Sequence, residues 1–81
     1  MDQHPQNHVI HYFVDDEEQT TTAHRLTVEQ ILKNAGLDPS THYLIELEGH
    51  HQVQHQNLGE EIRIHEKQKF ISVFNGPTPV S

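Results

Sequence analysis

The stretch LTVEQILKNAG, residues 26–36, decides the fold because it contains one complete helix together with its start and stop signals. Thr27 suits the N-cap, and Gln30 three residues later completes a capping box. Gly36 can adopt the left-handed conformation that ends a helix. The apolar residues fall on one stripe at helical spacing, namely Val28, Ile31, Leu32 and Ala35. A helix of about two turns is unstable alone in water, so this stripe must pack against other elements.

Strand-like segments flank this helix on both sides. Residues 9–14, VIHYFV, are rich in β-branched and aromatic side chains, which favour a strand. An acidic turn at 15–18 and a return strand at 19–24 complete a predicted hairpin. After the helix, the sequence predicts strands at 43–48, 62–65 and 70–74, and a loop or short irregular strand at 50–57. The order β-β-α-β-(β)-β-β, with one helix across a mixed sheet, predicts an α+β fold of the β-grasp type.

Composition bounds the domain and its partners. Apart from Met1 and Val80, every apolar residue of the 81 lies between Val9 and Phe74. We therefore expect one domain at 9–74, a disordered tail at 1–8 and a flexible tail at 75–81. A formal charge of −7 argues against nucleic acid and anionic membranes as partners. The chain has no cysteine and no apolar stretch long enough for a membrane span or signal peptide, so we expect a cytoplasmic protein.

Several motifs in this order resemble one known family. They are Leu26-Thr27 with Ile31-Leu32, Ala35-Gly36-Leu37-x-Pro39, Tyr43-x-Ile45, the closing Phe70-Ile71-Ser72-Val73, and Val14-Asp15 at the end of the first strand. Together they are similar to the bacterial ubiquitin-like proteins known as multiubiquitin domains, over residues 9–74. The resemblance implies a β-grasp protein modifier, which in some bacteria acts in defence against phage.

The resemblance also implies partners and a reactive end. The partners are a ubiquitin-activating-like enzyme, a conjugating-like enzyme, a JAB-type metallopeptidase and target proteins that receive an isopeptide bond. Gly76 is the predicted conjugation terminus, because it is the one glycine that follows the last strand. The predicted processing site is the Gly76–Pro77 bond, so that residues 77–81 form a removable pro-peptide. The single glycine and the proline after it depart from the familiar modifiers, which end in two glycines.

A partner-binding surface is predicted on the sheet face opposite the helix. Phe70, Ser72 and Phe74 alternate along the last strand and are the predicted binding residues. The stretch FISVF has large apolar groups on both faces, so the arrangement with Phe70 and Phe74 in the core stays open. That arrangement would leave Ile71 and Val73 outside. The alternative function is a non-conjugated β-grasp adaptor, which binds a protein partner reversibly through this open face.

The remaining reactive residues indicate no enzyme and no metal or other cofactor. The candidate acceptors for self-conjugation are the lysines Lys33, Lys67 and Lys69. His50, His51 and His55 lie near Glu48, but their spacing matches no closed metal site, and we interpret this segment as a polar loop. The chain has no cysteine nucleophile, no Gly-x-Ser-x-Gly motif and no phosphate-binding loop, so we expect no catalytic residue.

Overall fold

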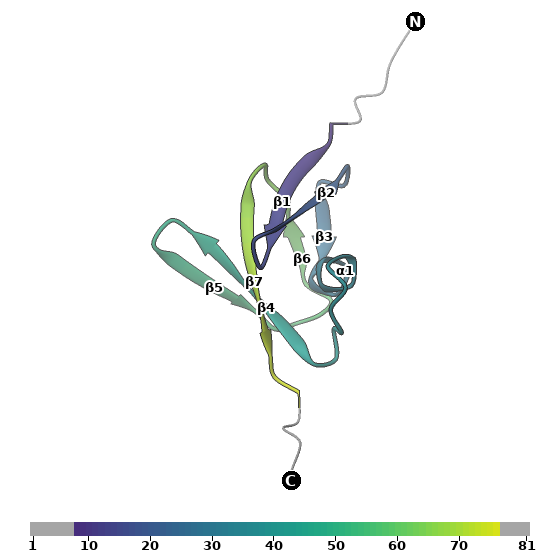
Figure 1. Ribbon diagram of the computed structural model, residues 1–81, viewed down its shortest axis with the longest axis vertical. Helices are drawn as coiled ribbons and strands as arrows, with labels where there is room; N and C mark the ends of the chain where they lie inside the picture. Colours follow the sequence, from purple (N-terminus) through teal and green to yellow (C-terminus); the bar gives the residue numbers. More distant parts are fainter. Residues whose placement is uncertain (1–7, 77–81) are drawn as a thin grey trace, which may run out of the picture.

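The fold is given by a computed structural model, which describes residues 8–76. The predicted disordered tail up to His8 and the predicted pro-peptide at 77–81 therefore lie almost wholly outside the described residues. Figure 1 shows the elements, which are β1 (Ile10–Val14), β2 (Glu17–Thr21), β3 (Arg25–Thr27), α1 (Val28–Asn34), β4 (His42–Glu48), β5 (His51–His55), β6 (Glu61–Arg63) and β7 (Gln68–Phe74).

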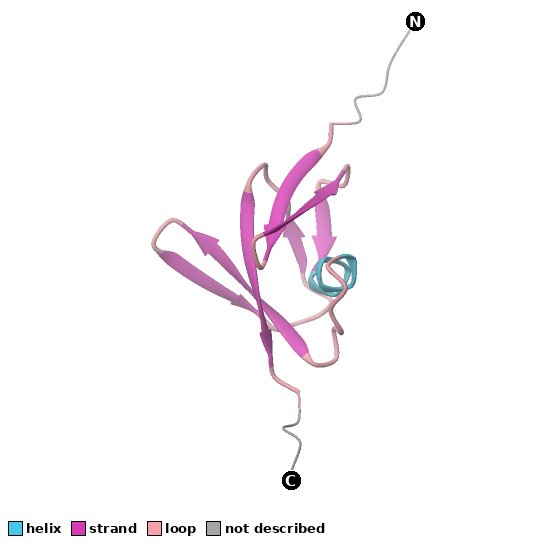
Figure 2. Ribbon diagram, in the orientation of Figure 1, coloured by secondary structure: helices cyan, strands magenta, loops and turns pink. Residues whose placement is uncertain are grey.

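Five of the strands form one mixed sheet in the order β2-β1-β7-β4-β5. The central pair, β1 and β7, is parallel, and the neighbours β1–β2, β4–β7 and β4–β5 are antiparallel. Strands β3 and β6 form a separate antiparallel pair beside α1 (Figure 2). The predicted α+β class with one helix and a mixed sheet is confirmed. In residues 8–76, no helix is long and apolar enough to cross a membrane.

Helix α1 begins and ends where its local sequence signals predict. The Gln30 N–H donates to Thr27 Oγ1 at 3.1 Å, and the Thr27 N–H donates to Gln30 Oε1 at 2.9 Å. At the other end Gly36 has a φ of 80°, and the N–H of Leu37 donates to the carbonyl of Leu32 at 2.9 Å. This is a Schellman motif, in which glycine accommodates the left-handed turn. The capping box and the Schellman motif both involve only residues close in sequence.

The core lies between one face of the sheet, the helix and the β3–β6 pair. Its buried members are Tyr12, Val14, Leu26, Val28, Ile31, Leu32, Leu44, Ile62, Ile64 and Phe70. The rings of Tyr12 and Phe70 meet edge to face with centroids 6.1 Å apart. Burial raises the pKa of the Tyr12 hydroxyl above its ordinary value of 10.0. The helical stripe predicted from the sequence is therefore the stripe that packs on the sheet.

The first hairpin is tighter than the predicted turn at 15–18. Asp15 and Asp16 alone form the turn, and both have left-handed backbones, with φ of 53° and 67°. Such two-residue turns match the right-handed twist of the paired strands. Because the turn is short, β2 starts at Glu17 and ends at Thr21, instead of spanning 19–24.

The polar segment at 50–57 also differs from its prediction. Residues His51–His55 form a regular strand that pairs with β4 from Leu44↔His55 to Glu48↔His51. Gly49 has a φ of 59° and turns the chain between these strands. The expected strand at 62–65 is shortened to β6, and it pairs with β3 rather than joining the main sheet. Both differences arise because pairing partners, more than local hydrophobicity, decide these strands.

Candidate functional site

The two faces of β7 settle which of its aromatic residues are exposed. Phe70 is 1% exposed and lies in the core, so the prediction that it contributes to an exposed binding face is wrong. Ile71 on the opposite face is 39% exposed, as the alternative arrangement required. Phe74 lies on the same side of the strand as Phe70 by alternation, yet it is 59% exposed. Its ring and the ring of His42 are arranged edge to face, with centroids 5.4 Å apart.

Ser72, the third predicted binding residue, is already engaged within the fold. Its backbone N–H donates to Asp15 Oδ1 at 2.9 Å, and its hydroxyl donates to Asp15 Oδ2. The side chain is partly buried. Ser72 therefore fastens the last strand to the first hairpin, and its hydroxyl would have to break this contact to reach a partner.

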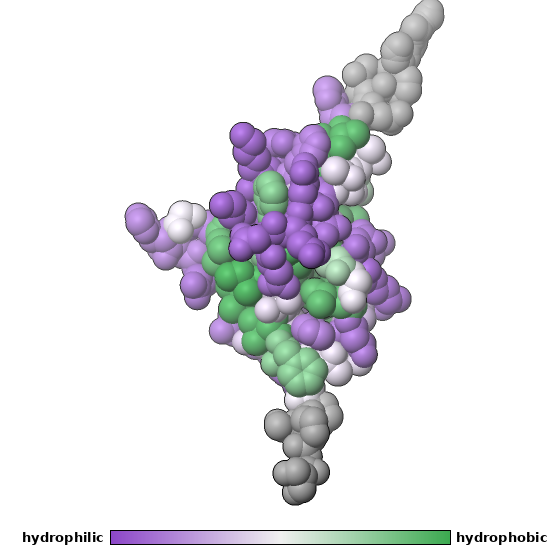
Figure 3. Space-filling view, viewed as in Figure 1, coloured by the Kyte–Doolittle hydropathy of each residue, from purple (hydrophilic) through white to green (hydrophobic). Residues whose placement is uncertain are grey.

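The sheet face turned away from the helix carries an apolar patch. It carries Tyr43, Ile45 and Leu47 from β4, Ile71 and Val73 from β7, and Phe13 from β1, and we call these six residues the outer face. The strand register places Ile45 opposite Ile71 and Tyr43 opposite Val73. Figure 3 shows apolar side chains gathered beside the hydrophilic β1–β2 hairpin, over the region of β7 and β4. Ile71 is exposed and the other five are partly exposed.

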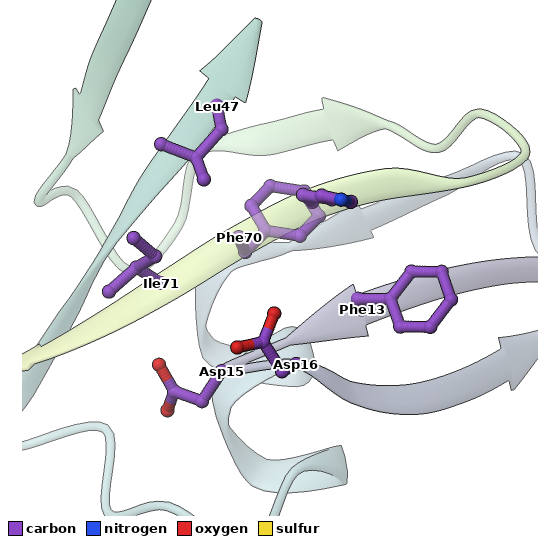
Figure 4. Close-up of a pocket in the computed structure, with 7 residues that line it drawn as sticks. Phe13, Asp15, Asp16, Leu47, Phe70 and Ile71 are labelled. Carbon is purple, nitrogen blue, oxygen red and sulfur yellow. The ribbon is translucent and has the colours of Figure 1, made fainter.

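A hollow of about 410 Å³ opens on the outer face next to the first hairpin. Phe13, Leu47 and Ile71 surround it, and the carboxylates of Asp15 and Asp16 lie at its hairpin end (Figure 4). Lys69, which lies between Phe13 and Leu47 in the register, also lines the hollow. The arrangement suits an apolar side chain that is followed by a cationic group. Because side chains alternate along a strand, Phe13 lies on the sheet face opposite to that of Tyr12.

The C-terminal end of the sheet holds the predicted conjugation residue. The Asn75 N–H donates to the carbonyl of Thr41 at 2.7 Å and extends the β4–β7 pairing by one residue. A Cβ atom on Gly76 would lie 2.9 Å from Thr41 Cγ2 and 3.1 Å from Phe74 Cζ. Gly76 therefore packs closely against the turn before β4. Pro77, the other half of the predicted processing site, lies outside the described residues.

No protein-family model, curated protein or solved structure matches the chain. The resemblance of residues 9–74 to multiubiquitin domains therefore stays a prediction.

The candidate acceptor lysines lie on three different elements. Lys33 is on α1 and pairs with Glu29 at 3.2 Å. Lys67 is in the turn before β7, where its φ is 66°, and Lys69 is on the outer side of β7. All three are exposed, so none is excluded sterically as an acceptor.

The histidines of the segment 50–57 differ in exposure. His50 and His51 are exposed, but His55 is buried between Glu46 and Glu60, so its assignment to a polar loop is wrong. Within residues 8–76, no group of three or more histidine, aspartate or glutamate side chains is arranged to hold a metal ion. Sequence reasoning missed the contacts of His55 with Glu46 and Glu60 because these residues are not adjacent in the chain.

Proposed function

We propose that the chain is a ubiquitin-like protein modifier with a β-grasp fold, matured at Gly76 and conjugated to target proteins. The observation that carries the proposal is the sheet order β2-β1-β7-β4-β5, with the last strand central and parallel to the first. This order, with α1 following the first hairpin, is compatible with the β-grasp fold that the resemblance implies. It brings the end of β7 to one pole of the sheet, where Gly76 follows two residues after Phe74.

The conjugation chemistry uses the carboxylate of Gly76. It would attack the α-phosphorus of ATP and release pyrophosphate, and an enzyme thiol would then displace AMP to form a thioester. A target amine would displace that thiol and leave an isopeptide bond. Glycine suits this path because a residue without Cβ can pass a narrow channel. The hydrogen bond from Asn75 to Thr41 would first have to break, and one such bond contributes only about 1 kcal/mol.

Maturation is tested by measuring the intact mass of the full chain after exposure to a JAB-type metallopeptidase. Loss of the mass of residues 77–81 supports Gly76 as the mature end. Conjugation is tested with the activating-like and conjugating-like enzymes and ATP, by the appearance of adducts. The Gly76→Ala variant and the chain truncated after Asn75 should form none. Normal adduct formation by both would exclude Gly76 as the reactive residue.

A second function is favoured by a separate observation, the apolar outer face. A non-conjugated adaptor would bind a protein partner there, with Ile45, Leu47 and Ile71 as contacts in place of the buried Phe70. The acidic hairpin beside the hollow favours a partner segment that carries lysine or arginine. Replacing Ile71 by aspartate should abolish such binding while the fold persists. An adaptor would keep its binding after truncation at Asn75, whereas a modifier would lose its adducts.

A further inference from the structure

A polar cluster is buried between the sheet and the segment that follows β5. Glu46 on β4 and His55 at the end of β5 are each 7% exposed. His55 Nε2 lies 3.1 Å from Glu46 Oε1, and His55 Nδ1 lies 3.0 Å from Glu60 Oε2. Each ring nitrogen therefore faces a carboxylate oxygen of a different glutamate.

The hydrogen bonds of Gln68 determine which partner each carboxylate oxygen of Glu46 has. Gln68 Oε1 accepts the backbone N–H of His65 at 2.8 Å, so the amide nitrogen of Gln68 is the end that donates to Glu46 Oε2, at 2.7 Å. Glu46 thus accepts at one oxygen from Gln68 and faces His55 with the other. Ionised carboxylates only accept hydrogen bonds, and a neutral imidazole has one donor nitrogen. Two acceptors on one ring therefore call for a proton on both nitrogens.

The same cluster reaches the start of the helix. The segment between β5 and β6 contains Glu60, whose carbonyl accepts the N–H of Val28 at 3.0 Å. The carbonyl of Leu58 accepts the N–H of Glu29 at 3.1 Å. These are two of the first amides of α1, which have no partner within the helix. The side chain of Glu60, which is partly exposed, also contacts His55, so this segment is joined both to the helix and to the sheet.

We propose that Glu46, His55 and Glu60 form a charged bridge in which His55 carries a proton on both ring nitrogens at neutral pH, and that this bridge fastens the segment 57–60 under the N-terminus of α1. The charged groups that face the ring are the carboxylate of Glu46 from β4 and that of Glu60 from the segment itself. From β7 the cluster receives the neutral amide of Gln68. The first charged residue of α1 is Glu29, which is paired with Lys33. Loss of the proton would turn a lone pair toward one carboxylate and release Glu60 to solvent.

The protonation state is read by long-range proton–nitrogen NMR of the imidazole rings in the full chain at about pH 7.5. An ordinary histidine is roughly nine-tenths neutral there, and the exposed His50 and His51 serve as internal references. The expected result is an imidazolium pattern for His55 that differs from the patterns of the two reference rings. A neutral pattern for His55 would overturn the proposal and indicate a protonated glutamate instead.

A matched pair of variants tests the fastening. Glu60→Gln removes the partly exposed carboxylate, and Glu61→Gln removes its exposed neighbour on β6. We expect Glu60→Gln to make His55 neutral and to speed hydrogen exchange at the Val28 and Glu29 amides by roughly tenfold, with no change in Glu61→Gln. If hydrogen exchange at these amides is unchanged in Glu60→Gln, the bridge does not hold the segment 57–60 at the N-terminus of α1. This conclusion would apply even if the His55 ring of the wild type is charged. Conjugation plays no part in either readout.

Discussion

Asp15 joins the first hairpin to the last strand through hydrogen bonds with Ser72, a residue 57 positions away. Its carboxylate accepts both the backbone N–H and the hydroxyl of Ser72, and its own N–H donates to the carbonyl of Phe70 at 2.9 Å. The backbone of Asp15 is left-handed, which aspartate tolerates better than most residues. One residue therefore closes the turn and also positions the turn against β7, at the edge of the outer hollow.

Replacing Asp15 by alanine should lower the free energy of unfolding by about 1–3 kcal/mol, because two donors of Ser72 lose a charged acceptor. Urea unfolding followed by circular dichroism measures the change. Asp16→Ala is the matched control, since Asp16 is also left-handed but makes no side-chain hydrogen bond to the other residues in 8–76. Equal losses in the two variants would assign the effect to the backbone and not to Ser72.

Phe70 and Phe74 should differ sharply in their effect on stability. Phe70→Ala empties a core site beside Tyr12 and should cost about 3–5 kcal/mol, whereas Phe74→Ala should cost less than about 1 kcal/mol. Thermal unfolding of both variants measures this contrast. Comparable losses would show that Phe74 is more deeply packed than its exposure indicates. Phe70→Leu, which keeps most of the volume, provides a folded reference if Phe70→Ala does not fold.

Local sequence signals predicted the helix. Pairing between distant residues decided the buried face of the last strand and the presence of β5, which the sequence alone did not predict. The capping box and the glycine stop involve residues within a few positions of each other, so the pattern around Thr27 and Gly36 predicts them. The face of FISVF that enters the core depends on the register of β7 with β1 and β4. The paired strand β5 has only Val53 as an apolar residue, and its partner β4 stabilises it.

The candidate sites divide in the same way. The place of Gly76 after the last strand follows from the order of elements, but its contact with Thr41 requires the β4–β7 register. The cluster around His55 draws on residues from 46 to 68, and no periodic pattern links them. Sequence reasoning assigned His55 to a polar loop because exposure is the commoner state of such side chains, and it did not single out the other members of the cluster.

Glu66 should make the protein less stable in acid. The backbone N–H of His11 donates to its carboxylate at 3.0 Å and, as the main cause, holds the pKa of Glu66 below its ordinary value of 4.5. The folded state thus binds this proton less readily than the unfolded state. The contribution is complete above about pH 4.5 and is lost as the pH falls through the lowered pKa.

The measurement is the difference in free energy of unfolding between about pH 6 and about pH 3. Glu66→Gln should reduce this difference, because the variant no longer has a carboxyl group to titrate at that site. Glu17→Gln, on the exposed face of β2, is the control and should leave the difference unchanged. If Glu66→Gln showed the same difference in free energy of unfolding as the wild type, the role of the His11 contact would be refuted.

Gly76 should be intolerant of a side chain for a structural reason that is independent of conjugation. A Cβ at this position would lie 2.9 Å from Thr41 Cγ2, closer than real Cβ contacts, so Gly76→Ala must displace the chain end from the turn before β4. We expect changed NMR shifts at Thr41 and His42, and faster hydrogen exchange at the Asn75 amide. Global stability should change by less than about 1 kcal/mol because this segment lies at the end of the sheet.

Two further variants make the test of Gly76 specific. Thr41→Ser removes the methyl group that causes the shortest contact, so combining it with Gly76→Ala should restore part of the Asn75 protection. Gly59→Ala is the control, because its nearest neighbour, Asn57 Oδ1, would be at an ordinary 3.6 Å. Unaltered shifts at Thr41 in Gly76→Ala would mean that the chain end does not rest on this turn in solution. The fold would then tolerate alanine at position 76. Any loss of adducts in Gly76→Ala would in that case arise from the enzymes that recognise the C-terminal carboxylate.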